Sequence, residues 1–287
     1  MSEMVYLNGS LVPREDARIM ALDYGFLYGY GLFETMRAYG GKVFRLEQHL
    51  ERLTGSAEKL GIKVDKSVLK DAVVDTIKAN GLSDARIRLT VSVGEGSMVP
   101  DPASCDSPTV LVVAGGYRPL PEEVYEKGFR AIVSSVRRKS QSPISAMKSL
   151  NYLESMLARR EARAAGVDEA ICLNEKGMLA EASMSNVFLV AGGILKTPAI
   201  ECGVLPGITR QAVLELAGKL KIPVLEDDIT LDELIKAEET FLTNSVIEIM
   251  PLTGVDGKLI GTGEPGQVTQ RLMFAYKEMV EREAGKN

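Results

Sequence analysis

The chain has 287 residues, a formal net charge of −5 and a sequence pI near 5.3. This acidic balance argues against a nucleic-acid surface, and no apolar run reaches the roughly 20 residues that cross a bilayer. The three cysteines, Cys105, Cys172 and Cys202, are widely spaced and have no metal-ligand spacing. They argue against a disulfide framework and fit a reducing cytosol. We therefore expect a cytoplasmic protein of about two domains.

The first half of the chain is predicted to alternate strands with helices. Asn8-Gly9 separates two short apolar runs and predicts a hairpin. Residues 23–31 are rich in Tyr and Gly, and glycines there permit close approach of the backbone. Further strands are expected at 32–39, 42–45, 85–93 and 108–114, and helices at 45–60 and 65–79. In the strand at 85–93, Arg86 and Arg88 share one face, whereas Ile87 and Leu89 share the other.

A glycine pair and two prolines at 115–121 form the best linker candidate. We therefore expect a small N-terminal domain at 1–114, this linker, and a larger domain at 122–287. Strands of the larger domain are predicted at 129–136, 169–173, 178–181, 187–190, 240–243 and 247–255, and helices at 153–165, 208–220, 230–236 and 266–283. The mixture of strands and helices in both halves indicates an α/β (α+β) protein.

One lysine lies just before the predicted helix at 153–165. Asn151 and Glu154 have the spacing of a capping box, and Gly166 has the position of a left-handed residue after the helix end. Lys148 precedes these residues, in an apolar setting. Most lysines are solvated surface residues. An apolar pocket would favour the neutral amine, which can attack an aldehyde and form a Schiff base.

Four further features could bind a cofactor. The stretch Leu205–Arg210 opens a helix, where backbone N–H groups and a threonine hydroxyl suit a phosphate monoester, although an ordinary helix start is equally consistent. Residues 243–245, Thr-Asn-Ser, could hydrogen-bond a phosphate or carboxylate, although turn chemistry is the commoner reason for them. Glu181 could pair with a protonated heterocyclic nitrogen, and Arg52 could bind phosphate. Taken singly, Glu181 and Arg52 are each more typical of a solvated surface residue.

His49 is the only histidine, so a Ser-His-Asp mechanism would have to use it. It lies in a charged helical stretch, residues 45–52, where we expect a solvated or capping role. Chemistry based on a lysine, carboxylates and a bound cofactor is therefore favoured.

Together these motifs resemble the class IV (fold type IV) pyridoxal-phosphate enzymes: branched-chain aminotransferases, D-amino-acid aminotransferases and aminodeoxychorismate lyases. The resemblance rests on Tyr-Gly-x-Gly-x-Phe-Glu at 28–34, Lys-Ser-Leu-Asn-Tyr at 148–152, Glu-Ala-Ser-x-Ser-Asn at 181–186 and Leu-Pro-Gly-Ile-Thr-Arg at 205–210. It covers nearly the whole chain, in order and spacing. It implies a small and a larger domain, a cofactor in the cleft between them, and a homodimer.

The resemblance also implies a role for each site residue. Lys148 forms the internal aldimine with pyridoxal 5′-phosphate and moves the proton at the substrate. Glu181 keeps the pyridine nitrogen protonated, so that the ring accepts electrons, and Tyr152 hydrogen-bonds the phenolate oxygen. The phosphate is held by Arg52, Ile208, Thr209 and Ser245. The substrate side is lined by Tyr28, Phe33, Thr35, Arg37, Arg88, Asn244 and Val246.

A few positions separate the subgroups. Thr35 stands where branched-chain enzymes usually have Gly and where lyases often have a threonine that protonates the leaving enolpyruvyl group. Residues 244–246 replace a Gly-Thr-Ala turn that binds the substrate carboxylate in branched-chain enzymes, which often have Tyr where Arg86 stands. The Arg-x-His carboxylate trap of the D-amino-acid enzymes has no second histidine here. The loop at 93–100 and the Arg88 strand are more similar to the branched-chain type.

We therefore expect transamination of a branched-chain-type amino acid with 2-oxoglutarate, ahead of the lyase reaction and of D-amino-acid transamination. The non-enzyme alternative is a small-molecule binding module that kept the fold and lost the chemistry. The presence of both Lys148 and Glu181 argues against it.

Overall fold

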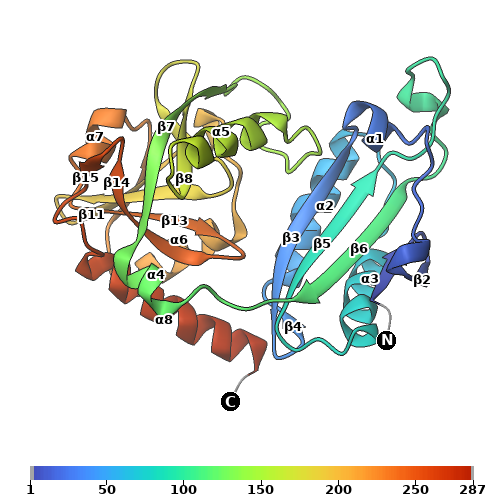
Figure 1. The fold of residues 1–287 in the computed structure, drawn as a ribbon, viewed down its shortest axis with the longest axis horizontal. Helices are drawn as coiled ribbons and strands as arrows, with labels where there is room; N and C mark the ends of the chain where they lie inside the picture. The colour runs from blue at the N-terminus through green and yellow to red at the C-terminus, as the bar shows by residue number, and fades with distance from the viewer. Residues whose placement is uncertain (1–2, 286–287) are drawn as a thin grey trace. The chain divides into compact units, whose positions relative to one another are not determined.

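A computed structural model describes residues 3–285, which divide into two compact units (Figure 1). The first unit contains residues 3–118, residues 280–285 and the short segment Met147–Asn151, which we call the lysine segment. The second unit contains Pro119–Ala146 and Tyr152–Met279. The division after Arg118 lies inside the predicted linker at 115–121. The last strand of the first unit already includes Gly115 and Gly116, however.

The first unit is a six-stranded antiparallel sheet with two long helices on one face (Figure 1). The strand order is β2-β1-β6-β5-β3-β4. Its elements are β1 (Met4–Leu7), β2 (Ser10–Pro13), α1 (Tyr24–Tyr28), β3 (Gly31–Tyr39), β4 (Lys42–Val43), α2 (Leu46–Lys59), α3 (Lys66–Ala79), β5 (Ala85–Ser92) and β6 (Thr109–Gly116). The predicted hairpin is confirmed, because Asn8 and Gly9 both have positive φ between β1 and β2, as a two-residue turn requires.

Strand β3 presents two different faces because its side chains alternate. Leu32, Met36 and Ala38 are buried in the core between the sheet and helices α2 and α3, together with Ile87 and Leu89 of β5. The residues between them point to the opposite face of the sheet. Across the strands the register pairs Phe33 with Thr90, Thr35 with Arg88, and Arg37 with Arg86. The predicted separation of arginines from aliphatic residues in β5 is confirmed.

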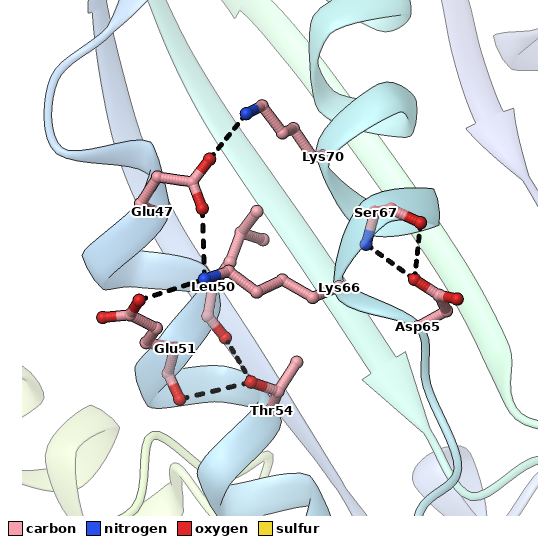
Figure 2. Close-up of polar contacts among 8 residues, drawn as sticks. All are labelled: Glu47, Leu50, Glu51, Thr54, Asp65, Lys66, Ser67 and Lys70. Carbon is pink, nitrogen blue, oxygen red and sulfur yellow. Dashed lines mark hydrogen bonds and ion pairs between the residues drawn. The ribbon is translucent and has the colours of Figure 1, made fainter.

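Helices α2 and α3 are joined at the surface by ion pairs (Figure 2). Lys66 Nζ lies 3.1 Å from Glu47 and 3.0 Å from Glu51, and Lys70 Nζ lies 2.6 Å from Glu47. Exposed pairs of this kind contribute about 0–1 kcal/mol each. The buried side chains of the two helices, such as Leu50, therefore account for most of the packing that fixes α2 against the sheet.

The second unit is a nine-stranded mixed sheet, ordered β12-β11-β10-β13-β14-β7-β8-β9, with β15 paired to β14. Its strands are β7 (Phe129–Arg138), β8 (Glu169–Asn174), β9 (Leu179–Ala182), β10 (Asn186–Ala191), β11 (Ile194–Pro198), β12 (Val224–Asp227), β13 (Glu239–Asn244), β14 (Glu248–Val255) and β15 (Lys258–Leu259). Its helices are α4 (Glu122–Lys127), α5 (Leu153–Ala164), α6 (Ile208–Lys219), α7 (Leu231–Ile235) and most of α8 (Gln267–Ala284). Alanines of α5 pack on β8.

Strands β11 and β12 and helix α4 were not predicted. Strand β12 is exposed along its whole length, so its sequence has no alternation to reveal it. No helix among residues 3–285 is long and apolar enough to cross a membrane.

The start of α5 differs from the prediction. Its N-cap is Tyr152, which makes no side-chain capping hydrogen bond. Asn151 instead donates from Nδ2 to the carbonyl of Gly29 at 3.0 Å. The predicted Asn151–Glu154 capping box is therefore wrong, because the Asn151 side chain is used within the first unit. The helix end is as predicted, with Gly166 at φ 68°.

Candidate active site

The lysine segment lies along strand β3. Phe33 N–H donates to the carbonyl of Lys148 at 2.8 Å, and Leu150 N–H donates to the carbonyl of Gly31 at 2.9 Å. Leu32 and Ser149 form an antiparallel bridge between these bonds. Because residues 31–33 pair with β5 on their other side, the lysine segment extends the sheet by a short stretch. This backbone pairing fixes Lys148 relative to the strand that carries Phe33 and Thr35.

The Phe33 ring has cationic groups beside it. Lys148 Nζ lies 4.7 Å from the ring centroid, and Arg88 Cζ lies 3.9 Å from it. An aromatic face attracts cations and holds them in a defined place. Four of the predicted residues therefore share one region of the first unit, because Thr35 is paired with Arg88 across the strands.

Arg37 and Tyr28 are the other two predicted substrate residues of the first unit. Arg37 follows Thr35 on the same face, with Cζ 4.4 Å from the Tyr39 ring centroid and 4.6 Å from that of Tyr117. Tyr28 ends helix α1, is 46 % exposed, and packs edge-on against Tyr24. Arg37 thus belongs to the face that carries Phe33, whereas Tyr28 lies at the end of a separate short helix.

Glu34 points to the helix side of β3 and is fully buried. Its carboxylate accepts hydrogen bonds from Arg52 Nε at 2.8 Å, from Arg52 Nη2 at 2.6 Å and from His49 Nδ1 at 2.7 Å. Burial alone would raise the pKa of Glu34, but the charges of Arg52 and His49 and their hydrogen bonds outweigh it and lower the pKa to about 2. Glu34 is therefore an ionised carboxylate at the centre of a buried network.

The expected solvated or capping role of His49 is wrong. The side chain is 1 % exposed, and burial lowers its pKa although the charge of Glu34 opposes this shift. A neutral His49 donates its Nδ1 proton to Glu34. The helical charge pattern of residues 45–52 concealed this, because His49 and Arg52 are three residues apart and lie on the face of α2 that meets the sheet.

The predicted phosphate ligand Arg52 is thus bonded along its Nε–Nη2 edge. A guanidinium is planar and carries five donors. An anion would have to approach Arg52 at the Nη1–Nη2 edge, away from Glu34. The side chain is 11 % exposed.

In the second unit, Glu181 is held by three groups. Its Oε1 lies 2.7 Å from Arg138 Nη2, and its Oε2 accepts from Leu205 N–H at 3.0 Å and from Asn186 Nδ2 at 3.5 Å. Sequence reasoning missed Arg138, because the strand was expected to end at residue 136 and in fact runs to Arg138. Parallel pairing of β7 with β8, and antiparallel pairing of β8 with β9, bring it beside Glu181.

Tyr152 is the N-cap of α5 in the second unit. Burial, followed by the negative charge of Glu181, raises its pKa to about 12. Its hydroxyl is therefore protonated at neutral pH and is suited to donate a hydrogen bond to an oxyanion.

The start of helix α6 fits an anion. Its N-cap, Gly207, provides no side-chain cap, so the first N–H groups of the helix, at Ile208 and Thr209, are not capped from it. A Cβ at Gly207 would collide with the Asn186 side chain. Asn186 pairs across strands with Thr243, whose buried Oγ1 has no hydrogen-bond partner among the described residues. Buried hydroxyls usually have a partner, so these features suit a phosphate monoester.

The last residue of β13 and the turn after it contain the last three predicted residues. Asn244 Oδ1 accepts hydrogen bonds from Val246 N–H at 2.8 Å and from Ile247 N–H at 2.9 Å. Its Nδ2 donates to Ser185 Oγ at 2.9 Å. Ser245 lies between them and is half-buried. The Asn244 side chain therefore already occupies the Val246 N–H.

Within residues 3–285 no cluster of three acidic, histidine or cysteine side chains could bind a metal ion.

The model of the class IV amino-transferases matches residues 31–255. The chain belongs to this family, whose members are pyridoxal-phosphate-dependent enzymes. The family and the two-domain α/β fold predicted from the sequence are thereby confirmed.

Relatives with different activities cover nearly the whole chain. A Methanocaldococcus jannaschii protein, provisionally named a branched-chain-amino-acid aminotransferase, is 42% identical over 96% of this chain and 96% of its own length. The branched-chain-amino-acid aminotransferase of Escherichia coli is 36% identical over 96% of this chain and 92% of its own length. The aminodeoxychorismate lyase of Bacillus subtilis is 34% identical, over 96% and 94%.

A solved structure agrees with these relatives. It is the T.th. branched-chain amino acid aminotransferase with pyridoxamine 5′-phosphate, which superimposes with a TM-score of 0.93. The two are 33% identical, and the match covers 99% of this chain and 95% of that one. A cofactor of the size and charge that the sequence predicts is therefore bound by a protein of this fold.

Proposed function

We propose that this protein is a branched-chain-type amino-acid aminotransferase that transfers the amino group to 2-oxoglutarate. The observation that carries the proposal is the pairing of the lysine segment with β3, because it brings Lys148 to the face of the sheet that carries Phe33 and Arg88. An apolar ring beside two cations suits both an aliphatic side chain and a carboxylate. Branched-chain aminotransferases among the relatives support this substrate class.

The residues that we assign to pyridoxal phosphate are those that the family resemblance implies. Lys148 binds it covalently. Arg52, the N–H groups of Ile208 and Thr209, and the Ser245 hydroxyl bind its phosphate. Glu181 accepts a hydrogen bond from the ring nitrogen, and Tyr152 donates one to the ring oxygen. When bound, the cofactor supplies an electron-accepting ring for reactions at the substrate Cα.

Chain residues supply the proton chemistry and the orientation of the substrate. The Lys148 amine removes the proton from the substrate Cα and returns it in the single shift that transamination needs. Phe33 packs against the aliphatic side chain of the amino-acid substrate. Arg88, whose guanidinium lies over the Phe33 ring, pairs with the second carboxylate of 2-oxoglutarate. One site can therefore accept an apolar donor and a dicarboxylic acceptor in turn.

Aminodeoxychorismate lyase is the second candidate. Thr35 favours it, because its hydroxyl lies two residues from Phe33 on the same face of β3 and opposite Arg88. That hydroxyl is suited to give a proton to a departing enolpyruvyl group. The Bacillus subtilis relative carries this activity in its name. D-Amino-acid transamination is the third candidate.

The assembly and location are proposed with the activity. We infer a cytoplasmic homodimer. Phe26 and Met98 of the first unit are each 78% exposed, and Val99 is 74% exposed, which suits burial against a second copy of the chain. Light scattering of the purified protein measures its mass directly, and a monomer would contradict the proposed dimer.

A paired assay tests the proposed activity. One arm measures the 2-oxo acids formed from leucine, valine and isoleucine with 2-oxoglutarate; the other measures pyruvate released from aminodeoxychorismate. A third arm contains D-alanine. We expect turnover in the first arm. Pyruvate release without transamination would establish the lyase instead.

Borohydride reduction tests the covalent site. Reduction of the holoenzyme should fix the cofactor to the tryptic peptide that contains Lys148, and Lys148→Ala should abolish the adduct. Lys139→Ala, at a lysine nine residues earlier in the sequence, is the control and should leave it unchanged. An adduct on another lysine in the wild type would refute the assignment.

A further inference from the structure

We propose that Glu34 and His49 are positioning residues that hold the Arg52 guanidinium so that its outer edge binds phosphate. This inference rests on the proposed role of Arg52 in the cofactor site. It assigns the discrimination between phosphorylated and unphosphorylated ligands partly to a carboxylate that never touches the ligand.

The contacts of Glu34 fix the Arg52 guanidinium in place. Glu34 makes a bidentate contact with Arg52, with both N···O distances at or below 2.8 Å, and a third contact with His49 at 2.7 Å. Arginine side chains are long and lose considerable rotamer entropy when fixed. A bidentate pair with a rigid, fully buried partner fixes both the place and the plane of the guanidinium.

Glu34 is also next to the residue of β3 that anchors the lysine segment. Glu34 follows Phe33 on β3, and Phe33 N–H is bonded to the carbonyl of Lys148. One strand therefore anchors the lysine segment through its backbone and Arg52 through the adjacent side chain. A buried ion pair is often no better for stability than apolar residues of the same volume. Stability alone therefore does not account for this arrangement. Holding Lys148 and Arg52 at fixed positions relative to one another does account for it.

The charge of Glu34 and its positioning of Arg52 predict opposite effects of Glu34→Gln on phosphate affinity, so the variant distinguishes them. Glu34 is ionised, and burial keeps His49 neutral, so the three groups together carry no net charge. Replacing Glu34 by Gln would add one positive charge near the phosphate. If charge decided the affinity, Glu34→Gln would bind phosphate more tightly. If position decides it, the variant binds phosphate less tightly, because the Gln amide places a donor against the donors of Arg52 or His49.

The experiment compares pyridoxal 5′-phosphate with pyridoxal, which lacks the phosphate. Dissociation constants of both are measured by absorbance titration of the full-length apoprotein. We expect Glu34→Gln to lower the preference for the phosphorylated form at least tenfold, because it removes the charge-assisted hydrogen bonds that fix the guanidinium. Pyridoxal affinity should change by less than about threefold. Glu47→Gln, which removes an exposed carboxylate of α2, the helix that carries His49 and Arg52, is the matched control and should retain the preference.

A double variant shows whether Glu34 acts through Arg52. Arg52→Gln should lower the preference by itself, and Glu34→Gln should add little to it, because the group that Glu34 positions is then absent. If Glu34→Gln does not fold, His49→Phe carries the test, since it removes one support of Glu34; His49→Asn, which keeps a donor near the Nδ1 position, should restore the preference.

The outcomes separate this inference from the proposed function. A folded Glu34→Gln variant with an unchanged or higher preference for the phosphorylated form would overturn the positioning role while leaving the proposed function intact. A wild type that takes up no pyridoxal 5′-phosphate would refute the proposed function, and the inference would fall with it.

Discussion

Arg138 and Glu181 form an ion pair in the second unit, with 2.7 Å between Nη2 and Oε1, and the two side chains are only 17% and 11% exposed. The pair joins the end of β7 to the end of β9. The other oxygen of Glu181 accepts a backbone hydrogen bond from Leu205. The residue expected at the ring nitrogen is therefore fixed from two sides before any ligand binds.

Removing Arg138 should destabilise the second unit. Arg138→Gln leaves a mostly buried carboxylate without its cation, and we expect a loss of about 1–3 kcal/mol in the free energy of unfolding. Urea unfolding of the apoprotein measures it. The double variant Arg138→Gln with Glu181→Gln should recover part of the loss, because no unpaired charge remains. Equal losses in the single and double variants would show that the ion pair is not the cause.

Gly207→Ala should weaken cofactor binding. Its φ of −69° is ordinary, so the effect is steric: the added Cβ meets the side chain of Asn186. We expect cofactor retention on dialysis to fall at least tenfold, about 1.4 kcal/mol. Gly218→Ala, on the same helix with open space around its Cβ, is the control and should be neutral or slightly stabilising. Similar behaviour of the two variants would contradict an anion site at the start of α6.

Thr35→Gly should separate the two leading functions. In an aminotransferase Thr35 only shapes the pocket, so transamination of branched-chain substrates should remain within about tenfold, or about 1.4 kcal/mol. In a lyase the hydroxyl relays a proton, which typically contributes 10²- to 10⁴-fold. A wild type that releases pyruvate from aminodeoxychorismate, and loses this activity a hundredfold in the variant, would establish the lyase reaction.

Glu34 should make the protein acid-labile in a defined pH window. Its pKa is about 2 in the folded protein and 4.5 ordinarily, so the unfolded chain binds the proton more tightly. This depressed pKa contributes about 3 kcal/mol of stability above pH 4.5, which is lost as the pH falls from 4.5 toward 2. Burial also lowers the pKa of His49 from its ordinary value of 6.5. His49 therefore contributes stability that is likewise lost as the pH falls below 6.5.

Urea unfolding between pH 7 and pH 3 measures the effect. The wild type should be more stable than Glu34→Gln at pH 7, and the difference should shrink as the pH falls below 4.5. A difference that does not change with pH would contradict an ionised Glu34.

Several features were determined by the sequence alone. The Asn8-Gly9 turn, the alternation of Arg86 and Arg88 with aliphatic residues, and the start of α6 after Gly207 all matched the structure. These features depend on backbone preferences and side-chain periodicity over a few residues, which any stretch of sequence displays directly. Family motifs are equally local, so the class of enzyme could be predicted before the fold was known.

Only the tertiary structure decided how the site residues are supported. Lys148 follows the linker in sequence, yet its segment pairs with β3 in the first unit, more than a hundred residues away. Glu34 and His49 form a buried network with Arg52, and Arg138 meets Glu181, through pairings that no local pattern encodes. A charged side chain has the same local preferences whether it is solvated or buried. What distinguishes the two states is the partner that packing brings within hydrogen-bonding distance, because a buried charge is stable only when it is paired.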